Sequence, residues 1–248
     1  MLVTGCLVVA LAVGCTGAVR APLADPGAGD GPVVAPAPAP QTAPPTVAGP
    51  EAARGPRAAP PAAPPPRQPS RSTGLPWNGR LANGAQVPSS GPHHVTWDPV
   101  LRAHPNRAWR RWGNDRAVDT LMRVAGRYAR AHPDRPRLVI GDLSRPRGGD
   151  FGPRFGLPGH ASHQSGLDID LYYPRRDGRL APPDTPVQVD RAPSQWLVDA
   201  FVAEGAVLVF TGPSLDLRGP TSVVQPLVHH DNHLHIRFAP GSLPRGGR

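Results

Sequence analysis

Apolar residues recur three and four positions apart in two stretches of the chain, which is the period of an amphipathic helix. In 115–132 they form one stripe, and Asn114 is placed to cap the first turn. That stripe consists of Val118, Leu121, Met122, Ala125, Tyr128 and Ala129. In 192–204 the apolar face begins after Asp190, and Gly205 ends it. The sequence therefore predicts two helices that each bury one face.

Short apolar or alternating stretches predict four strands, at 138–143, 167–173, 207–211 and 234–238. Alternation places apolar side chains on a core face and the intervening side chains on the opposite face. Asp168 and Asp170 share the polar face of the second strand, and His233 and His235 share that of the fourth. The order of helix, two strands, helix, two strands predicts an α+β domain with a small, mainly antiparallel sheet and flanking helices.

The first 75 residues differ in composition from the rest, because they hold 16 of the 36 prolines together with many alanines. Such a segment has too little apolar surface to offset its ordering entropy, so we expect it to be disordered. No run near 20 apolar residues is present, which excludes a polytopic membrane protein. We therefore expect a Pro/Ala-rich linker in 18–75 and a single folded domain in 76–248.

The chain begins with the apolar run 2–14, which is too short to span a bilayer but suits an export signal. The four residues that end at Cys15 resemble a bacterial lipobox, which implies acylation of that cysteine. Plain secretion remains the alternative. We expect an export signal in 1–17 and a location in the periplasm or cell envelope, with any membrane contact made only through a lipid anchor.

Charge and cysteine content remove several classes of function. The net charge is +9, and every basic residue is arginine, so a P-loop nucleotide site, which needs a lysine, is excluded. A basic chain favours polyanionic surroundings, but no aromatic-basic interleaving or helix-turn-helix pattern indicates nucleic-acid binding. Both cysteines precede residue 16, so the domain has neither a disulfide nor thiolate chemistry.

Six of the ten histidines lie in two short windows, 159–170 and 229–235, together with aspartates. Clustered imidazoles and carboxylates are costly unless a cation organises them. His163, Asp170 and one of His233 or His235 could converge on one ion. Two imidazoles and one carboxylate with an open fourth place are the ligands of a catalytic zinc site.

These windows carry a resemblance to a known family. Gly-His-x2-His-Gln-x-Gly-x-Asp and His-x2-His-x-His, joined to Gly-Asp-Leu-Ser-Arg-Pro-Arg-Gly-Gly at 141–149, resemble the penicillin-insensitive murein endopeptidases. These bacterial enzymes cut cross-linking peptide bonds in peptidoglycan, and they are grouped with zinc peptidases such as lysostaphin and the D-Ala-D-Ala metallopeptidases, and with the hedgehog domain. The resemblance covers about 138–238 and implies a hedgehog/D-Ala-D-Ala peptidase-like fold.

The resemblance also implies residue roles, with Zn2+ as the cofactor and a peptidoglycan peptide as the substrate. His163, Asp170 and His235 match the zinc ligands, and His233 matches the active-site histidine that polarises or deprotonates the water. His230 matches a further histidine of the active site. No glutamate lies in either window, so a histidine base fits the chemistry better than a glutamate base.

Several residues near the motifs have two interpretations. The resemblance implies that His160 lines the site. Asp168 either fixes a ligand ring or is a solvated strand residue. Arg145 and Arg147 form either a clamp for a carboxylate of the wall peptide or a solvated turn. Structural or surface roles are expected for the other histidines and for two tryptophans: His93, His94, His104, His132, His229, Trp109 and Trp112.

Three alternatives to the endopeptidase stay open. The first is a D-Ala-D-Ala carboxypeptidase or dipeptidase of the same zinc architecture. The second is a non-catalytic lipoprotein that binds the cell wall. The third is a non-haem iron oxygenase, which also uses two histidines and one carboxylate but usually places the acid two residues after the first histidine.

Overall fold

The computed structural model of the chain describes residues 68–155 and 159–240. The expected export signal, Cys15 and the linker up to residue 67 lie outside the described residues. The expected boundary at residue 76 falls inside them, and there the structure differs from the prediction. Strand β1, Arg71–Leu75, pairs with β2, Asn78–Ala82, so folded structure begins before residue 76.

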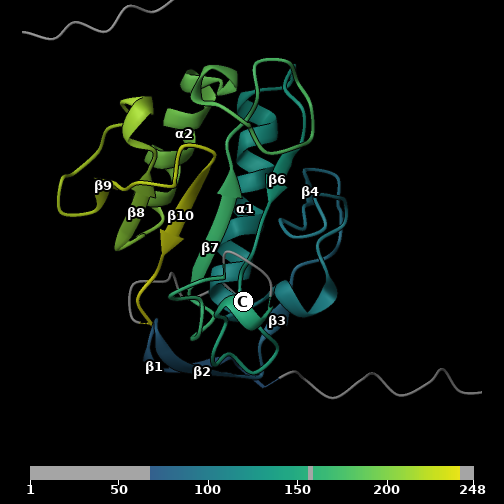
Figure 1. The fold of residues 1–248 in the computed structure, drawn as a ribbon, viewed down its shortest axis with the longest axis vertical. Helices are drawn as coiled ribbons and strands as arrows, with labels where there is room; N and C mark the ends of the chain where they lie inside the picture. The colour runs from purple at the N-terminus through teal and green to yellow at the C-terminus, as the bar shows by residue number, and fades with distance from the viewer. Residues whose placement is uncertain (1–67, 156–158, 241–248) are drawn as a thin grey trace, which may run out of the picture. The chain divides into compact units, whose positions relative to one another are not determined.

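One six-stranded sheet organises the described residues, in the order β4-β6-β7-β10-β8-β9. Its four inner strands, β6, β7, β10 and β8, pair in antiparallel fashion, whereas the outer pairs β4-β6 and β8-β9 are parallel (Figure 1). The bounds are His94–Thr96 for β4, Leu138–Ile140 for β6, Asp168–Tyr172 for β7, Leu208–Thr211 for β8, Val224–Pro226 for β9 and His233–Arg237 for β10. The mainly antiparallel sheet is confirmed.

Both predicted helices are confirmed. Helix α1 spans Asp115–Ala131, and the Asn114 side chain accepts a hydrogen bond from the Arg116 N–H at its start. Helix α2 spans Arg191–Ala203 and ends before Gly205. Short 3-10 turns occupy Ala108–Arg110, Pro153–Phe155, Pro186–Gln188 and Pro213–Leu215.

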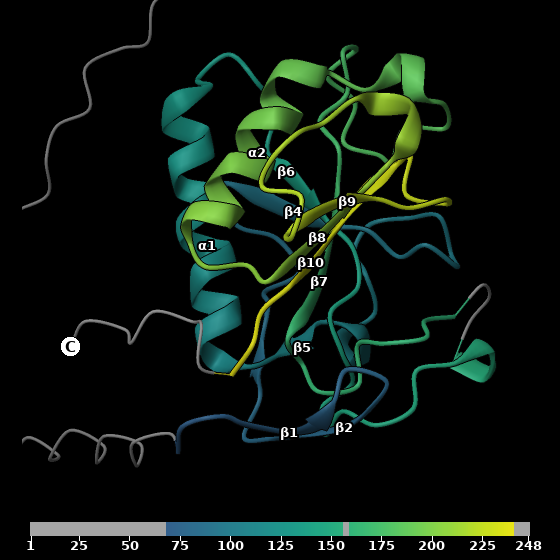
Figure 2. The ribbon, with the colours of Figure 1, turned by 90° about the vertical axis from the view of Figure 1, so that its left-hand side faces the viewer.

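The two helices lie on the same face of the sheet (Figure 2). Their apolar stripes pack on alternate strand residues in one core, for example Leu121 and Phe201 with Ile169 and Ile236, all fully buried. Alternate residues of β7 and β10 therefore point to the other face of the sheet, away from the helices. Polar side chains of these two strands occupy that face.

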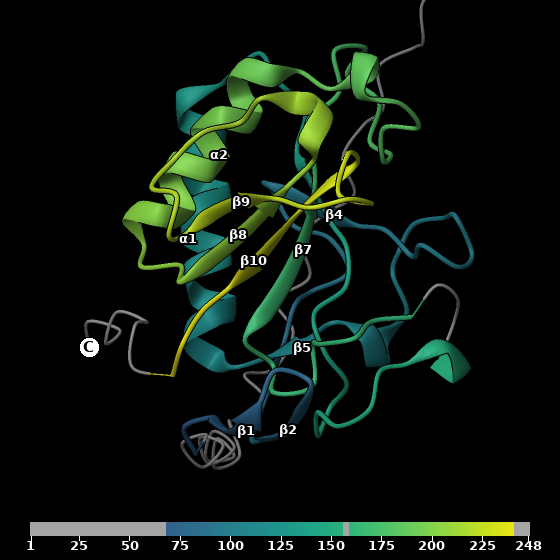
Figure 3. The same cartoon turned by 60° about the vertical axis from the view of Figure 1, so that its left-hand side comes forward.

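Sequence analysis missed the small elements around this core. Besides the β1–β2 hairpin, these are the outer strands β4 and β9 and a two-stranded pair, β3 at Ala85–Gln86 and β5 at Trp112–Gly113. Figure 3 shows the hairpin at the bottom of the view, separate from the main sheet. Strands of two or three residues are too short to display a period. Among the described residues, no helix has both the length and the apolar character needed to cross a membrane.

Candidate active site

The register between β7 and β10 brings the two sequence windows together. His235 pairs with Asp170 across the strands, and Arg237 pairs with Asp168. Residues paired in this way point to the same face of a sheet. The imidazole of His235, from the second window, therefore lies directly beside the carboxylate of Asp170, from the first window.

His163 reaches the same place from the loop that precedes β7. Its backbone has a φ of 67°, in the left-handed region, and its N–H donates to Asp168 Oδ2 over 3.0 Å. Its ring Nδ1–H donates to the carbonyl oxygen of Leu143, which leaves Nε2 free to face the strands. A strained backbone held by hydrogen bonds fixes the direction of this ring.

Three donor atoms from these residues form a nearly equilateral triangle. His163 Nε2 lies 3.3 Å from Asp170 Oδ1 and 3.3 Å from His235 Nδ1, and the last two atoms are 3.1 Å apart. Tetrahedral zinc with bonds of about 2.0–2.1 Å places its ligand atoms about 3.3 Å apart. The predicted set of His163, Asp170 and His235 therefore has the spacing of metal ligands.

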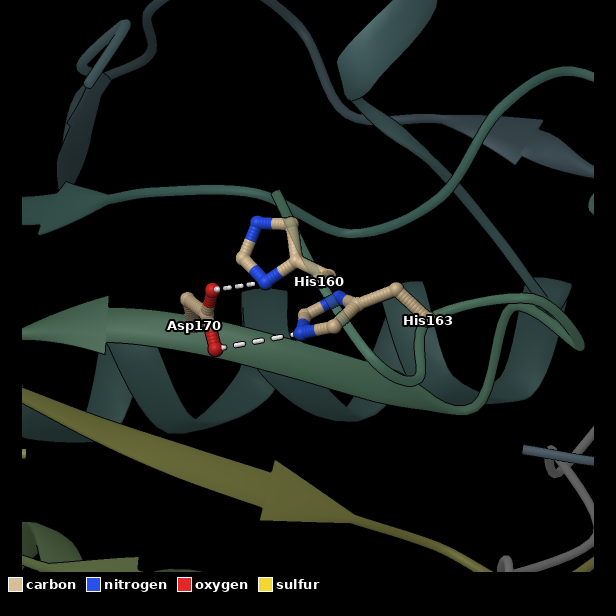
Figure 4. Close-up of side chains that lie close together, drawn as sticks. All are labelled: His160, His163 and Asp170. Atoms are coloured by element: carbon tan, nitrogen blue, oxygen red, sulfur yellow. Dashed lines mark ion pairs between the residues drawn. The ribbon is translucent and has the colours of Figure 1, made fainter. Parts of the chain in front are cut away.

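His160 lies on the other side of the Asp170 carboxylate. Its Nδ1 is 3.6 Å from Asp170 Oδ2, and its Nε2 is 2.7 Å from Asp142 Oδ2. Figure 4 shows the rings of His160 and His163 turned toward the two oxygens of Asp170. One ligand atom from each of these three residues lies within 4.8 Å of the others. The site thus offers two overlapping donor sets, which share His163 and Asp170.

The structure decides between the two interpretations of Asp168. Its side chain is fully buried and accepts hydrogen bonds from the His163 N–H, from His235 Nε2 at 3.1 Å and from Arg237 Nε at 2.5 Å. The interpretation as a solvated strand residue is wrong. A carboxylate on the far nitrogen of a ligand histidine orients that ring and raises its basicity.

A buried network behind His160 was not predicted. Asp142 accepts hydrogen bonds from His160, from Asn106 at 2.8 Å and from two nitrogens of Arg110. Both Asp142 and Arg110 are 1% exposed, and the guanidinium also lies 4.9 Å from the ring centre of Phe151. Asp142 belongs to the 141–149 motif, but Asn106 and Arg110 lie just before and at the end of the short 3-10 turn Ala108–Arg110, which shows no periodicity. Only the fold reveals their contact.

His233 and His230 lie beside the donor triangle. His233 Nε2 is 3.8 Å from Asp170 Oδ1, and its Nδ1 is 2.7 Å from the side-chain oxygen of Asn232. The ring of His230 is 4.7 Å from that of His233, and its Nδ1–H donates to the Val228 carbonyl. The two predicted catalytic histidines are therefore adjacent to each other and to the donor set.

The carboxylates of Asp168 and Asp170 favour a positive charge between them, as the pKa shifts of the neighbouring groups show. Burial by itself raises the pKa of Asp170, but His163 and His233 hold that pKa well below its usual range. Burial lowers the pKa of His235, yet hydrogen bonds with Asp168 and Asp170 outweigh burial and raise it to about 9. Burial dominates at His233 and lowers its pKa to about 4, so this ring is neutral at pH 7.

The site opens into a hollow of about 880 Å³. His160, Asp170, His230, His233 and His235 all line it. The remaining lining is largely apolar and includes exposed side chains from two loops, namely Trp77, Leu227 and Val228. An open hollow with polar groups on its floor and apolar walls is the usual form of a ligand site.

Arg145 and Arg147 are not among the described residues that line this hollow. Arg145 stacks on Phe155 at 4.0 Å and donates to the Asp150 carbonyl. Arg147 is exposed and lines a different hollow, beside β2. The two interpretations of these arginines, a carboxylate clamp or a solvated turn, both stay predictions, and neither side chain lines the site hollow in the described residues.

The histidines expected to be structural lie away from the donor set. His94 is buried and its ring contacts the Pro88 carbonyl, and His132 packs against Tyr128 and Trp196. His229 is exposed as predicted, but it also lines the site hollow. Trp109 packs edge-on to Phe151, 5.7 Å between ring centres, in agreement with the expected packing role.

The fold and the site together define a mixed α/β domain with a candidate metal centre in an open hollow. A sequence profile of the family described as penicillin-insensitive murein endopeptidase matches residues 72–198, about half of the chain. The chain therefore belongs to the penicillin-insensitive murein endopeptidase family. The matched range includes the first histidine window and ends before the second.

Two curated proteins with the name penicillin-insensitive murein endopeptidase are similar to this chain. The protein from Haemophilus influenzae is 25% identical over 189 residues, which cover 65% of this chain and 60% of that protein. The protein from Salmonella heidelberg is 29% identical over 127 residues, which cover 41% of this chain and 44% of that protein. This chain thus spans less than two thirds of the length of either relative.

Proposed function

We propose that this chain is a zinc-dependent peptidoglycan endopeptidase, which hydrolyses the peptide bonds that cross-link murein. The observation that carries the proposal is the triangle of His163 Nε2, Asp170 Oδ1 and His235 Nδ1, with edges of 3.1 to 3.3 Å. Membership of the family supports the substrate. We further propose that the domain has the hedgehog/D-Ala-D-Ala peptidase type of fold.

The residues present fit a zinc ion. His163, Asp170 and His235 supply two imidazole nitrogens and a carboxylate oxygen, the donor types of catalytic zinc. The far nitrogen of each ring is engaged, His163 Nδ1 with the Leu143 carbonyl and His235 Nε2 with Asp168, as is usual for metal-binding histidines. A zinc ion held there would polarise the scissile carbonyl and activate the attacking water.

His233 is placed to accept and return a proton. Its Nδ1–H donates to Asn232 Oδ1, which leaves the lone pair at Nε2 directed toward the donor set, 3.8 Å from Asp170 Oδ1. A general base must lie within hydrogen-bonding reach of the proton that it abstracts, directly or through one water. We assign the proton transfer to the leaving amine to this atom, and to His230, whose ring centre lies 4.7 Å from that of His233, the support of the His233 ring.

The proposed substrate requires a location where peptidoglycan is accessible. We propose that the chain is exported to the periplasm or cell envelope, with the segment 1–17 as the signal and Cys15 as the acylated residue if the signal is of the lipoprotein type. Mass spectrometry of the mature N-terminus distinguishes the lipid-modified from the secreted form.

Purified protein with defined cross-linked muropeptide dimers tests the function. We expect monomers as products, loss of activity with a chelator and recovery with Zn2+. Asp170→Ala and His235→Ala should lose both metal and activity. His233→Ala should keep about one zinc per chain and lose activity by a factor of about 10²–10⁴, the usual contribution of a general base.

Other products would select the alternatives. Stem peptides that lose only a terminal alanine indicate a carboxypeptidase. Binding of murein without any cleavage, by protein that contains zinc, indicates a non-catalytic wall-binding protein. Full activity in metal-free protein would contradict the proposal.

A further inference from the structure

A second hollow of about 450 Å³ adjoins the site. It shares Pro99, Tyr172 and Asn232 with the site hollow, so the two hollows are direct neighbours. Asn232 is also the residue that holds the His233 ring. A substrate bound at the donor set can therefore extend from there into the second hollow.

The lining of the second hollow differs in charge from that of the site hollow. It includes three arginines, Arg102, Arg175 and Arg179, and one carboxylate, Asp184. Arg175 is a structural residue, because its guanidinium is 2% exposed and bonds to Asp177 and to the side chain of Gln188. Its guanidinium also donates to the Pro182 carbonyl, so it is held by groups of the protein itself.

The other two arginines differ from each other. Arg102 lies 3.4 Å from Asp184, and both side chains are mostly exposed. Arg179 is exposed, and its backbone N–H donates to Asp177 over 3.1 Å. Within residues 68–155 and 159–240, its guanidinium has neither an ion pair nor a hydrogen bond. Among the arginines of the second hollow, Arg179 is therefore the one whose guanidinium makes no ion pair within the described residues, with the Asp177 carboxylate as a neighbouring opposite charge.

We propose that the second hollow is a subsite for a carboxylate of the substrate peptide and that Arg179 is the residue that binds this carboxylate. The proposal rests on the proposed function. A guanidinium binds a carboxylate through two parallel N–H donors. Trp97, Pro99 and Pro182 supply apolar surface in the same hollow. Tyr172 and Asn232 lie at the junction between this subsite and the donor set.

Two pairs of ligands test the subsite. In each pair the peptides are cross-linked dimers that differ only in one group, a free carboxylate or a carboxamide, on the stem. One pair has a normal cross-link and the other a methyleneamine in place of the scissile amide, so that the protein cannot hydrolyse it. Calorimetry gives Kd for the uncleavable pair, and kcat/KM is measured for the cleavable pair, both with the full chain loaded with zinc.

We expect wild type to bind the carboxylate ligand about tenfold more tightly than the carboxamide ligand, as one charge-assisted pair allows. Arg179→Gln should bind both ligands equally, with the Kd that wild type shows for the carboxamide. Arg218→Gln removes the same charge at an exposed arginine paired with Asp216, and it should keep the wild-type preference. The cleavable pair should show the same preference for the carboxylate ligand in kcat/KM, and the preference should come from a difference in KM and not in kcat.

Two results would overturn the subsite: a wild-type protein without any preference, or a preference that survives in Arg179→Gln. Failure of the proposed function looks different, because wild type would then leave both cleavable dimers intact. The Kd values of the uncleavable pair report on Arg179 in either case.

Discussion

Asp168 serves three hydrogen-bond donors with one buried carboxylate, and two of these donors belong to the proposed zinc ligands. It holds the backbone of His163 and the far nitrogen of His235, and the third donor is Arg237. Burial raises the pKa of this carboxyl, but the hydrogen bond from His235 and the neighbouring positive charges lower it to about 2. The group is therefore ionised at pH 7, so it can accept all three bonds.

Replacing Asp168 by Asn should weaken zinc binding by about 10–100-fold, the usual effect of losing the carboxylate behind a ligand histidine. The amide keeps the shape but loses the charge that orients His235. Competition with a chromogenic chelator measures this affinity. Asp199→Asn, on the exposed side of α2, is the matched control and should bind zinc as wild type does. Equal affinities of wild type and Asp168→Asn would contradict the role.

Substitution of His160 distinguishes between the two possible sets of metal ligands, His163, Asp170 and His235 or His160, His163 and Asp170. If His163, Asp170 and His235 hold the metal, His160→Ala should retain close to one zinc per chain, whereas His235→Ala should lose it. The reason is that the three atoms of the first set already have the tetrahedral spacing, while His160 Nδ1 lies 3.6 Å from Asp170 Oδ2, on the other side of the carboxylate. Metal analysis of dialysed protein measures the stoichiometry. The reverse result would assign the ion to the His160 set.

At the scale of elements, the β1–β2 hairpin supports the loop that carries His163. The Gln164 N–H donates to the Pro76 carbonyl at the hairpin turn, and the Leu81 N–H donates to the Arg147 carbonyl. Gly149 N–H bonds to the carbonyls of both Gly79 and Gln164. The hairpin, the 141–149 motif and the ligand loop therefore form one hydrogen-bonded layer beneath the site.

Gly148→Ala should disrupt this layer. Gly148 has a φ of 65°, and a Cβ there would overlap the Gln164 carbonyl oxygen and approach the Leu81 nitrogen to 2.8 Å. We expect a loss of unfolding free energy above about 3 kcal/mol, because steric overlap adds to backbone strain. Urea denaturation measures it.

Gly178→Ala is the matched control for this substitution. Gly178 has a φ of 72°, but a Cβ there would meet no atom within 4 Å. Only the strain of the left-handed conformation, about 1–2 kcal/mol, should then be lost. Similar losses in the two variants would show that the packing of Gly148 on the loop contributes little.

Periodicity correctly predicted which side chains of each strand share a face of the sheet. It placed Asp168 with Asp170 and His233 with His235, and both pairs lie on the polar face. It could not predict that His235 is opposite Asp170, because register depends on all the pairings of the sheet rather than on one strand. The β1–β2 hairpin was missed for a different reason: its residues follow directly on the proline-rich stretch and include Gly74, Pro76 and Gly79, which are typical of loops.

At the scale of the whole molecule, protonation of Asp98 couples the stability of the fold to pH. Asp98 directly precedes Pro99, which lines both hollows. Burial by itself raises the pKa of Asp98, but hydrogen bonds from the Leu101 N–H, the Arg107 guanidinium and the Val100 N–H outweigh burial and lower it. A lowered folded-state pKa means that Asp98 stabilises the fold at pH values above its unfolded pKa of about 3.9. That contribution is lost as the pH falls through the lowered pKa.

Asp98→Asn should therefore be less stable than wild type at pH 7, and the difference should shrink as the pH is lowered below about 4. Thermal unfolding between pH 7 and pH 2.5 follows both proteins. Asp119→Asn, on α1, should track wild type at every pH, since no hydrogen bond or ion pair of its carboxylate is found in the described part of the chain. A difference in unfolding temperature between Asp98→Asn and wild type that stays constant with pH would contradict this role of Asp98.

The hairpin has a practical consequence for anyone who shortens the chain. Composition suggests a cut at residue 76, yet such a cut deletes β1 and leaves β2 without its partner strand. It also deletes Ser70, whose hydroxyl accepts from the Asp115 N–H and whose N–H donates to the Asp115 carboxylate at the start of α1. A trimmed protein that begins at residue 76 would be a poor source of crystals, whereas one that begins at residue 68 keeps the hydrogen bonds that support the loop carrying His163.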